Sequence, residues 1–551
     1  MKRSERPGFW TLVTILGYAV VGFFLLYPLS GIFKFAFIDK DSGLFALSNF
    51  REFFGRTYYT VSFLNTLVVS VGGTLGAMLL GVPLAFFMTR YRIFGKPLLS
   101  TLAVLGLLSP PFIGAYSWIM LLGRSGSVRT LLLGLGINFP SIYGPLGIIL
   151  VYSLQYYPFV FLLASGGLGL VDRSLEEAAE NLGAIGFRKF FRVTLPLVLP
   201  SVTAGALIVF MMCLSNFDTP MIIGGNYRVL PTLAYNLFTS EVGERPGLAS
   251  TVSIFLILFA SGVIFLQRWV AGRRKYSSSL INRPRVQVLR GARAAGAHLV
   301  CYLIVALSTL PMAIVVLYSF RKTSGPVFKP GFGLESYARV FYEVQKTITN
   351  SLLYSVSAVV LIVVVGTLLG YILARRRTVP AQVLDPLLMI PYIVPGTVVG
   401  IGFIMAFNRK PLFLLGTGLL IILAYFIRRL PYSVRSGASI LKQIDPALEE
   451  AGINLGASPA RTFRRVTLPL MLPGVISGAI MSWVTAVNEI SASILLYVGK
   501  TMTMPIRIFL SVMDGYFGPA SALSTILLLV TGIGLFLANK FSGTGRESLV
   551  T

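Results

Sequence analysis

Two similar stretches of sequence determine the predicted fold. Residues 175–200 read LEEAAENLGAIGFRKFFRVTLPLVLP, and residues 448–473 read LEEAGINLGASPARTFRRVTLPLMLP. The stretches share 18 of 26 residues without a gap, at an offset of 273. Upstream, further pairs match at an offset of 285, among them Asn65 and Asn350, Gly81 and Gly366, and Arg90 and Arg375. The chain is therefore predicted to be a duplicated unit.

The composition places this duplicated unit in a membrane. Of the 551 residues, 55% are hydrophobic and only 12% are charged, with a mean hydropathy of +0.79. These values exclude a soluble globular chain, a disordered chain and a fibre. The formal charge of +27 would indicate nucleic-acid binding in a soluble protein. Here the basic residues separate apolar segments, which favours a surface against membrane lipid and no nucleic-acid partner.

The fold class expected is an all-α polytopic membrane protein with about 12 transmembrane helices in two parallel six-helix repeats. A spanning helix needs about 20 mostly apolar residues. The apolar stretches that meet this length are 9–36, 59–89, 98–122, 143–171, 197–224, 248–271, 295–319, 347–374, 385–408, 412–440, 470–496 and 518–540. An even number of spans in each repeat puts both LEEA stretches on the same side of the membrane, so the repeats are parallel.

The distribution of Lys and Arg predicts the orientation and the boundaries. Residues 268–293 carry eight basic side chains and no acid, which is typical of a cytoplasmic loop. Both termini are then cytoplasmic as well. The predicted division is a first repeat over residues 1–271, a basic linker over 272–294 and a second repeat over 295–551. The coupling loops defined below lie at 172–196 and 445–469.

Each LEEA stretch is predicted to form a short cytoplasmic helix, a turn and the start of the next span. Ser174 and Glu177 have capping-box spacing, and Asp445 precedes a proline at a helix start. Gly183 and Gly456 end the short helices. Such a helix can dock in a groove of a partner protein and push on the neighbouring spans.

The spacing resembles the coupling motif of permease subunits of binding-protein-dependent ABC importers. The pattern is Glu-Ala-Ala, three residues, Gly, nine residues, an aliphatic residue, one residue and Leu-Pro. In this sequence it falls on Glu177, Ala178, Ala179, Gly183, Val193, Leu195 and Pro196, and on Glu450, Ala451, Gly452, Gly456, Val466, Leu468 and Pro469. Gly452 stands where the family usually has alanine, a change expected to be tolerated. The resemblance assigns to coupling with an ATPase the residues Glu177, Ala178, Ala179, Gly183, Glu450, Ala451, Gly452 and Gly456.

The fused, duplicated arrangement looks like the ferric-iron type of permease. The resemblance implies a multi-pass protein of the bacterial cytoplasmic (inner) membrane. Its implied partners are two copies of a separate ATP-binding subunit, which bind ATP and Mg²⁺, and an extracytoplasmic substrate-binding protein. The sequence has no Gly-x-x-x-x-Gly-Lys-Ser/Thr phosphate loop, so ATP hydrolysis is assigned to another chain and no cofactor to this one. Related permeases leave polyamine, thiamine, phosphonate and sugar phosphate open as substrates.

Polar residues in the spans after the coupling loops are candidates for a translocation path. They are Asn216 and Asp218 in the first repeat, and Asn488 and Glu489 in the second. Ionisable groups at membrane depth are costly and usually face an interior or a cavity, so two carboxylates are able to line a cation path. The alternative is hydrogen bonding between helices or a position near the outer interface of the membrane. The prolines and glycines at 109–111 and 391–396 predict a helix break or a kink in matching spans.

Two other classes of protein remain as alternatives. A secondary transporter driven by an ion gradient would also have parallel repeats, but it would not need the paired coupling loops. A membrane enzyme would need a catalytic cluster, and the sequence has none. The sequence also shows no metal-site spacing, since Cys213 and Cys301 lie far apart and the single His298 is expected to be structural.

Overall fold

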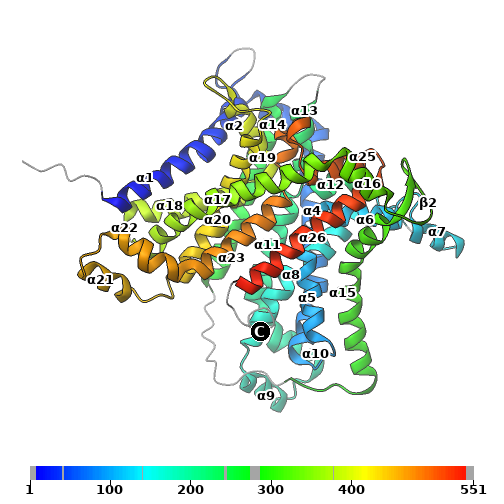
Figure 1. Cartoon of the computed structure of the whole chain (residues 1–551). Coiled ribbons are helices and arrows are strands. Elements are labelled where there is room, and N and C mark those ends of the chain that lie inside the picture. Colours follow the sequence, from blue (N-terminus) through cyan, green and yellow to red (C-terminus); the bar gives the residue numbers. More distant parts are fainter. Residues whose placement is uncertain are drawn as a thin grey trace, which may run out of the picture. The chain divides into compact units, whose positions relative to one another are not determined.

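We describe the chain from a computed structural model, shown in Figure 1. The described residues are 8–39, 43–138, 140–240, 245–273, 286–376 and 378–541. Most of the predicted basic linker and both extreme termini lie outside them. The described part is almost wholly helical, with two short hairpins formed by β1 (Arg321–Ser324) with β2 (Val327–Phe332) and β3 (Asn408–Arg409) with β4 (Leu412–Phe413). The predicted all-α class is confirmed.

Nine helices of the described residues are long and apolar enough to cross a membrane, and two bent helix pairs raise the number to eleven. One further long helix, α20 (Gly418–Leu441), is not among them. It carries Arg428, Arg429 and Arg435, which lower its hydropathy, and it covers most of the predicted span 412–440. Helix α20 therefore counts among the 12 predicted helices because of its position in the repeat, and not because of its hydropathy.

The two predicted proline-rich spans are sharply broken. Helix α5 (Lys96–Leu108) is followed by α6 (Pro111–Leu122), and the stretches Lys96–Leu107 and Pro111–Gly134 meet at 101°. Helices α18 (Val379–Ile393) and α19 (Gly396–Phe407) meet at 105°. Pro110 and Pro395 stand at the breaks, where a missing N–H prevents the helical hydrogen bond from continuing. Of the two predicted outcomes, a break rather than a kink is confirmed.

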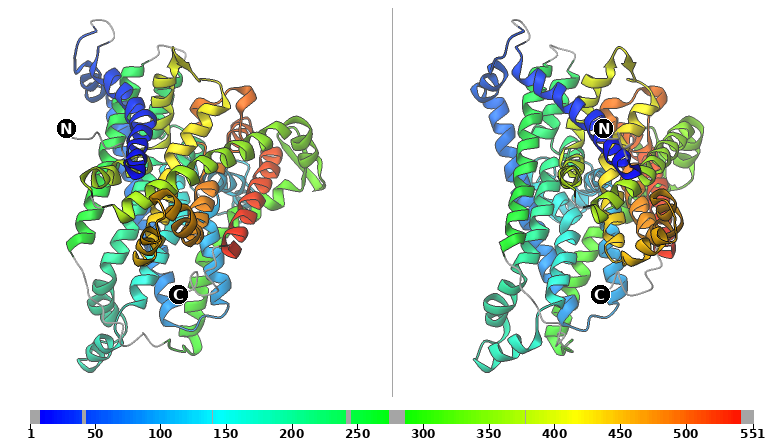
Figure 2. Two further views of the ribbon diagram at one scale, coloured as in Figure 1. Left: turned by 60° about the vertical axis from the view of Figure 1, so that its left-hand side comes forward. Right: turned by 90° about the vertical axis from the view of Figure 1, so that its left-hand side faces the viewer.

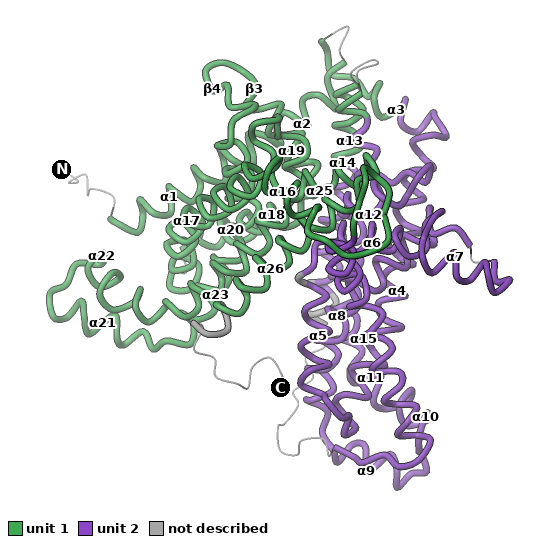
Figure 3. Tube along the Cα trace, turned by 45° about the vertical axis from the view of Figure 1, so that its right-hand side comes forward, with its two compact units in different colours: residues 1–51, 237–254, 322–544 green, residues 52–236, 255–321, 545–551 purple. Residues whose placement is uncertain are grey.

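The chain forms two compact units that do not coincide with the sequence repeats. Unit 1 comprises residues 1–51, 237–254 and 322–544, and unit 2 comprises residues 52–236, 255–321 and 545–551 (Figure 3). Unit 1 holds the start of the first repeat (residues 1–51) and most of the second repeat. Unit 2 holds most of the first repeat and the start of the second (residues 295–321).

Unit 2 is built around α4 (Thr57–Arg90) and α8 (Pro145–Gly169), which pack along each other. Its other elements are α5, α6, α7 (Ser127–Gly134), α9 (Arg173–Asn181), α10 (Gly186–Lys189), a π-helical turn η2 (Phe190–Thr194), α11 (Leu195–Ser215), α12 (Asp218–Ile223) and α15 (Gly291–Ser319). In both views of Figure 2 the teal residues around α9 lie at one end of these long helices.

Unit 1 is built in the same way around α17 (Gln345–Arg375) and α20. Its other elements are α1 (Phe9–Val21), η1 (Gly22–Leu26), α2 (Tyr27–Phe37), α16 (Glu335–Glu343), α18, α19, α21 (Ala447–Asn454), α22 (Pro459–Thr462), η3 (Phe463–Thr467), α23 (Leu468–Val487), α24 (Ser493–Leu496), η4 (Gly499–Thr501), α25 (Met504–Met513) and α26 (Phe517–Phe541). Helices α3 (Ser48–Gly55), α13 (Leu230–Thr239) and α14 (Pro246–Arg273) continue from one unit into the other.

Glycines allow the central helix pair of each unit to approach closely. A Cβ atom on Gly81 of α4 would lie 2.8 Å from the Tyr157 carbonyl oxygen of α8. At the matching position of unit 1, a Cβ on Gly366 of α17 would lie 2.9 Å from the Ser433 Cβ of α20. Small residues are what membrane helices use for such approaches, so this repeated glycine has a packing role in both units.

The first helix of each repeat is held in the unit that contains most of the other repeat. In unit 2, the Tyr302 hydroxyl of α15 donates to the Phe94 carbonyl at 2.8 Å. His298, one turn earlier, accepts from the Phe94 N–H at Nε2 over 3.1 Å and contacts the Ala294 carbonyl through Nδ1 at 2.7 Å. In unit 1, Tyr18 of α1 donates to the Pro380 carbonyl at 2.8 Å. His298 thus has the structural role that was predicted.

Candidate functional site: the two coupling segments

The first coupling segment consists of α9, a turn, α10 and η2, and it leads directly into α11. Asp172 caps α9, since its side chain accepts a hydrogen bond from the Ser174 N–H at 2.9 Å. The predicted capping box of Ser174 with Glu177 is therefore replaced by an aspartate cap two residues earlier. A π-helical turn precedes Leu195, where the membrane helix begins as predicted.

A largely buried ion pair holds α9 against the end of α4. The Arg90 Nη2 atom lies 2.8 Å from Glu176 Oε1, and the two side chains are only 7% and 14% exposed. The Thr194 hydroxyl of η2 donates to the same carboxylate oxygen at 3.0 Å. Glu176 therefore joins three parts of unit 2: the end of a membrane helix, the short helix α9 and the start of α11.

The second coupling segment repeats this arrangement in unit 1. Arg375 Nε at the end of α17 lies 2.9 Å from Glu449 Oε1, and these side chains are 14% and 10% exposed. The second donor differs: the Tyr371 hydroxyl donates to Glu449 Oε2 at 2.8 Å. The hydroxyl of Thr467, the counterpart of Thr194, forms no hydrogen bond with the part of the chain that the structure describes.

An aromatic stack from α1 completes the second segment. The Trp10 ring lies over the Tyr371 ring with centroids 3.8 Å apart and an interplanar angle of 10°. Phe463 of η3 meets both rings edge-on, at 5.3 Å and 5.4 Å. In unit 2 the matching contact is a simple edge-on pair of Phe86 and Phe190 at 4.8 Å. The N-terminal helix therefore supports the second coupling segment within unit 1.

The motif glutamates predicted for coupling are the neighbours of the anchoring ones. Glu177 is 51% exposed and pairs with Arg173 one turn earlier on α9, and Glu450 is exposed on α21. Ala178 and Ala451 are also exposed, whereas Ala179 is buried. The predicted set therefore faces mainly outward, where a partner can reach it, while Glu176 and Glu449 attach the segments to the chain itself.

Both predicted turn glycines have left-handed backbone conformations. The φ angle is +79° at Gly183 and +85° at Gly456, and in each case an added Cβ would meet no atom within 4 Å. Each N–H closes the helix end on the carbonyl three residues earlier, at 2.9 Å. The requirement for glycine is therefore one of backbone conformation rather than of space.

Gly452 lies beside a threonine, where the first segment has a lysine at the matching position. A Cβ at position 452 would lie 3.2 Å from the Thr462 Cγ2 atom and 3.5 Å from its Oγ1. The residue that matches Thr462 in the first segment is Lys189, which pairs with Glu180 instead. The branched Thr462 side chain therefore occupies the space where the methyl group of an alanine would be.

Each segment presents one almost fully exposed leucine beside its turn glycine. Leu182 is 88% exposed and Leu455 is 89% exposed, and the two positions match at the repeat offset. Both leucines lie between short helices that carry several charged residues. Exposed large apolar side chains that recur at one place on a polar segment are typical of a protein contact surface.

The four predicted path residues lie at or just after the ends of α11 and α23, and all but the half-buried Asn488 are buried. Asn216 is 8% exposed, and its amide donates to the Tyr156 hydroxyl at 2.9 Å while its Oδ1 accepts from the Thr219 N–H at 2.9 Å. Asp218 begins α12 and is 6% exposed. In unit 1, Asn488 Nδ2 contacts Thr531 Oγ1 at 3.5 Å. Three of these residues therefore have a polar neighbour or a place at a helix start.

Glu489 is paired within unit 1. Its side chain is 1% exposed and forms an ion pair with Arg428 of α20. The carboxylate also accepts hydrogen bonds from the N–H groups of Ala492 at 2.9 Å and Ser493 at 3.1 Å, at the start of α24. This description covers only unit 1, so the predicted role of the four residues in a common path stays a prediction.

Comparison with known proteins now places the chain in a family. The family described as "Binding-protein-dependent transport system inner membrane component" matches residues 77–276 and 366–542. The chain belongs to this family. Each match contains one coupling segment and begins inside the second long helix of its repeat, α4 or α17. The first helices of the two repeats, α1 and α15, therefore lie outside both matches. The double match confirms the duplicated permease architecture.

Individual relatives agree with this assignment. The chain is 28% identical to the ferric transport system permease protein FbpB of Actinobacillus pleuropneumoniae, over 93% of this chain and 75% of the relative. It is 25% identical to the Fe(3+)-transport system permease protein FbpB 2 of Haemophilus influenzae, over 98% and 99% of the two chains. It is also 32% identical to the spermidine/putrescine transport system permease protein PotB of Haemophilus influenzae, over 44% of this chain and 87% of the relative.

The anchoring residues of this permease were not predicted from its sequence. Arg90 and Arg375 match in the repeat, as do Glu176 and Glu449, but at two different offsets of 285 and 273. A signal was therefore present: a charged residue repeated at the end of one membrane helix and an acid repeated in the coupling segment. To pair each arginine with its glutamate, one must know that the end of α4 or α17 lies against the coupling segment of the same repeat.

Proposed function

We propose that this permease is the membrane subunit of an ATP-driven importer whose two coupling segments each receive one ATP-binding subunit. The observation that supports this most strongly is the duplicated anchor, Arg90 with Glu176 and Arg375 with Glu449. A segment that must push on membrane helices needs a firm connection to them, and each anchor joins it to the end of a long helix. ATP and Mg²⁺ are then bound by the partner, and this chain hydrolyses no ATP.

The exposed parts of the segments suit such a partner. Leu182 and Leu455 offer one apolar anchor each, and Glu177 and Glu450 offer exposed carboxylates one to two turns earlier. An apolar anchor surrounded by charged residues is a common composition for the centre and rim of an interface. We place both segments, and with them both termini, on the cytoplasmic side.

Ferric iron is the substrate we propose, delivered by an extracytoplasmic binding protein. Support comes from the names of the relatives that span nearly the whole chain. A polyamine is the second candidate, because the spermidine/putrescine relative matches one half of the chain at a higher identity. Both candidates are cationic, in keeping with the buried carboxylates Asp218 and Glu489.

Reconstitution tests the proposal directly. The chain is co-expressed with its ATP-binding subunit and its substrate-binding protein, and the complex is placed in liposomes. We expect uptake of iron loaded on the binding protein to require ATP inside and to persist when an ionophore removes the ion gradient. Uptake that stops with the ionophore and needs no ATP would instead indicate a secondary transporter. Uptake of spermidine without iron would replace the substrate.

A further inference from the structure

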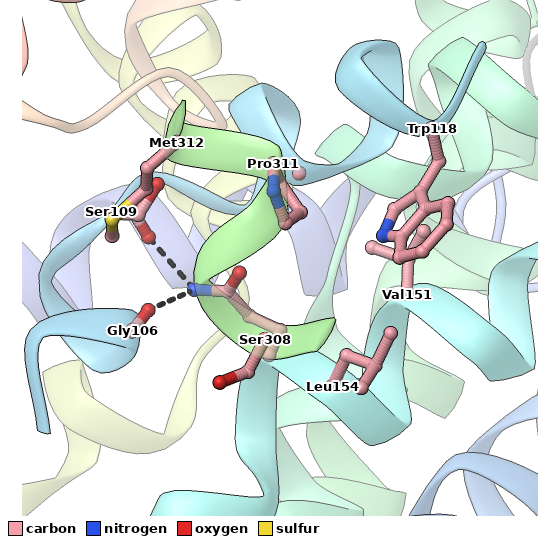
Figure 4. Close-up of a pocket in the computed structure, with 10 residues that line it drawn as sticks. Gly106, Ser109, Trp118, Val151, Leu154, Ser308, Pro311 and Met312 are labelled. Atoms are coloured by element: carbon pink, nitrogen blue, oxygen red, sulfur yellow. Dashed lines mark hydrogen bonds between the residues drawn. The ribbon is translucent and has the colours of Figure 1, made fainter. Parts of the chain in front are cut away.

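The broken span of unit 2 is held together by one side chain of α8. Pro110 and Pro111 have no N–H, so carbonyl groups at the end of α5 lose their helical partners. The Gln155 amide donates to the Gly106 carbonyl at 3.0 Å and to the Ser109 carbonyl at 2.8 Å. The dashed lines in Figure 4 end on these two carbonyl oxygens, in a small cavity that Trp118, Ser308 and Pro311 also line.

The next residue of α8 connects to the helix that follows the coupling segment. The Tyr156 hydroxyl accepts a hydrogen bond from Asn216, which stands just after the last residue of α11. Helix α11 begins directly after the first coupling segment and is 21 residues long, or about 30 Å at 1.5 Å per residue. Two adjacent residues of α8 therefore tie the far end of α11 to the break between α5 and α6.

In unit 1 a single arginine makes the corresponding connection. Arg428 of α20 matches Gln155 at the repeat offset, and Glu489 matches Asn216. The Arg428 side chain lies against the break, since a Cβ on Gly396 at the start of α19 would be 2.8 Å from its Nη1 atom. The same side chain pairs with Glu489, just after the end of α23, and the two are 13% and 1% exposed.

We propose that these contacts are relays that transmit movement of each coupling segment to the broken span of the same unit. This rests on the proposed function, because the movement comes from the ATP-binding subunits. The path in unit 2 runs from α9 through α11 and Asn216 to Tyr156, Gln155 and the break. In unit 1 it runs from α21 through α23 and Glu489 to Arg428 and the break. Arg428 and Gln155 are positioning residues in these relays.

The physical basis is that a closely packed helix moves as a rigid body and transmits displacement where a directional contact joins it to the next element. Plain packing of α8 on α11 would hold the unit together without fixing the broken span to either helix. In unit 2 the hydrogen bonds of Gln155 fix it through the freed carbonyls, and in unit 1 Arg428 and Ser491 both lie close to Gly396. The link to the residue after the end of the long helix is made by Tyr156 in unit 2 and by Arg428 itself in unit 1.

The repeat itself supplies the matched variants. Arg428→Gln removes the connection and leaves the Glu489 carboxylate without its counter-ion. The triple variant Arg428→Gln, Arg429→Tyr and Glu489→Asn introduces the residues that make the connection in unit 2. Arg435→Gln is the control, because Arg435 also joins α20 to the broken span, through an ion pair with Asp385, but at 46% and 41% exposure.

The experiment measures two rates in the same liposomes: ATP hydrolysis, and uptake of the iron that the binding protein delivers. For Arg428→Gln we expect normal assembly with the ATP-binding subunits and a fall of roughly 2- to 30-fold in solute moved per ATP hydrolysed, the range of coupling energies typical of such positions. The triple variant should recover most of this ratio, and Arg435→Gln should leave it unchanged.

The relay would be overturned if the amount of solute moved per ATP stayed constant while transport and ATP hydrolysis both fell with the amount of folded protein. Arg428 would then have only a structural role. Should Arg428→Gln fail to fold, Gln155→Leu in unit 2 decides by the same criterion, since it strands no charge. The proposed function fails separately: in that case the unmodified chain would neither bind the ATP-binding subunit nor move solute with ATP.

Discussion

Arg90 and Glu176 form an ion pair across unit 2, with Nη2 and Oε1 2.8 Å apart and little of either side chain exposed. The partners come from the end of α4 and from α9, and the same contact recurs in unit 1 between Arg375 and Glu449. Burying a charge pair is costly unless the partners are well matched, and removing one partner leaves the other charge uncompensated. The anchors should therefore be sensitive to single substitutions.

We expect Glu176→Gln and Glu449→Gln each to destabilise the coupling segment by about 3 kcal/mol, because a buried guanidinium loses its counter-ion. Limited proteolysis of the purified chain checks this, with faster cleavage expected between residues 172 and 194 or between 445 and 467. The effect should be larger than that of Thr194→Val, which removes only a hydrogen bond to Glu176.

The adjacent glutamates provide the control for the anchors. Glu177→Gln and Glu450→Gln alter exposed side chains, so the protease pattern should stay as in the unmodified chain, within the small range of surface pairs. Their effect should appear instead in binding of the ATP-binding subunit. Equal protease sensitivity of Glu176→Gln and Glu177→Gln would show that the buried pair is not an anchor.

Replacing the turn glycines should strain the backbone. Gly183→Val together with Gly456→Val places a β-branched residue at φ +79° and φ +85°, which costs about 1–2 kcal/mol at each position. Membrane insertion should be unchanged while transport and binding of the ATP-binding subunit fall. Gly262→Val is the control, since an added Cβ there also meets nothing within 4 Å but the backbone is helical. Normal binding and uptake in the double variant would contradict the prediction.

A double-mutant cycle tests the packing of Gly452 against Thr462. Gly452→Ala places a methyl group 3.2 Å from Thr462 Cγ2, so we expect a small loss of stability, about 1 kcal/mol, through overpacking. With Thr462→Ser the crowding methyl is gone, and Gly452→Ala should become neutral or stabilising, as alanine favours the helix. Thermal unfolding in detergent measures both steps, and additive effects would show that the two side chains do not interact.

The exposed leucines should matter only for the partner. Leu182→Ser and Leu455→Ser change side chains that contact little of the described chain, so expression and thermal stability should stay within about 0.5 kcal/mol. Binding of the ATP-binding subunit should weaken about tenfold for each, as is usual when an apolar anchor of an interface is truncated. Leu175→Ser, at 48% exposure on the same segment, serves for comparison. Unchanged binding would exclude these leucines from the interface.

The sequence allowed the repeat, the broken spans and the turn glycines to be predicted because each depends on local chemistry. A proline without an N–H breaks a helix wherever it stands, as at Pro110 and Pro395. A left-handed turn calls for glycine, as at Gly183 and Gly456. The long helices other than α20 follow from apolar length.

Long-range pairing could not be predicted in this way. Nothing local to Glu176 distinguishes it from Glu177, and the motif comparison drew attention to the exposed neighbour. The exchange of first helices also has no local signal, since the Tyr18 contact to Pro380 joins residues far apart in sequence. Glu489 was predicted as a path residue from its position, but its pairing with Arg428 depends on how α20 packs on α23.

The last prediction concerns the remaining carboxylate, Asp218, which is 6% exposed at the start of α12. Glu489 forms an ion pair with Arg428, so a change at Asp218 tests the cation path without breaking that pair. Asp218→Asn preserves shape and removes the charge, while Asp218→Glu preserves the charge. If the residue helps a cationic substrate to pass, uptake should fall about tenfold in the first variant and much less in the second, since a carboxylate that faces a path attracts a cation and an amide does not. Protein level and binding of the ATP-binding subunit should be normal in both. Equal loss of folded protein in both variants would assign Asp218 to the packing of α12, and faster uptake in Asp218→Asn would indicate an anionic solute and exclude ferric iron.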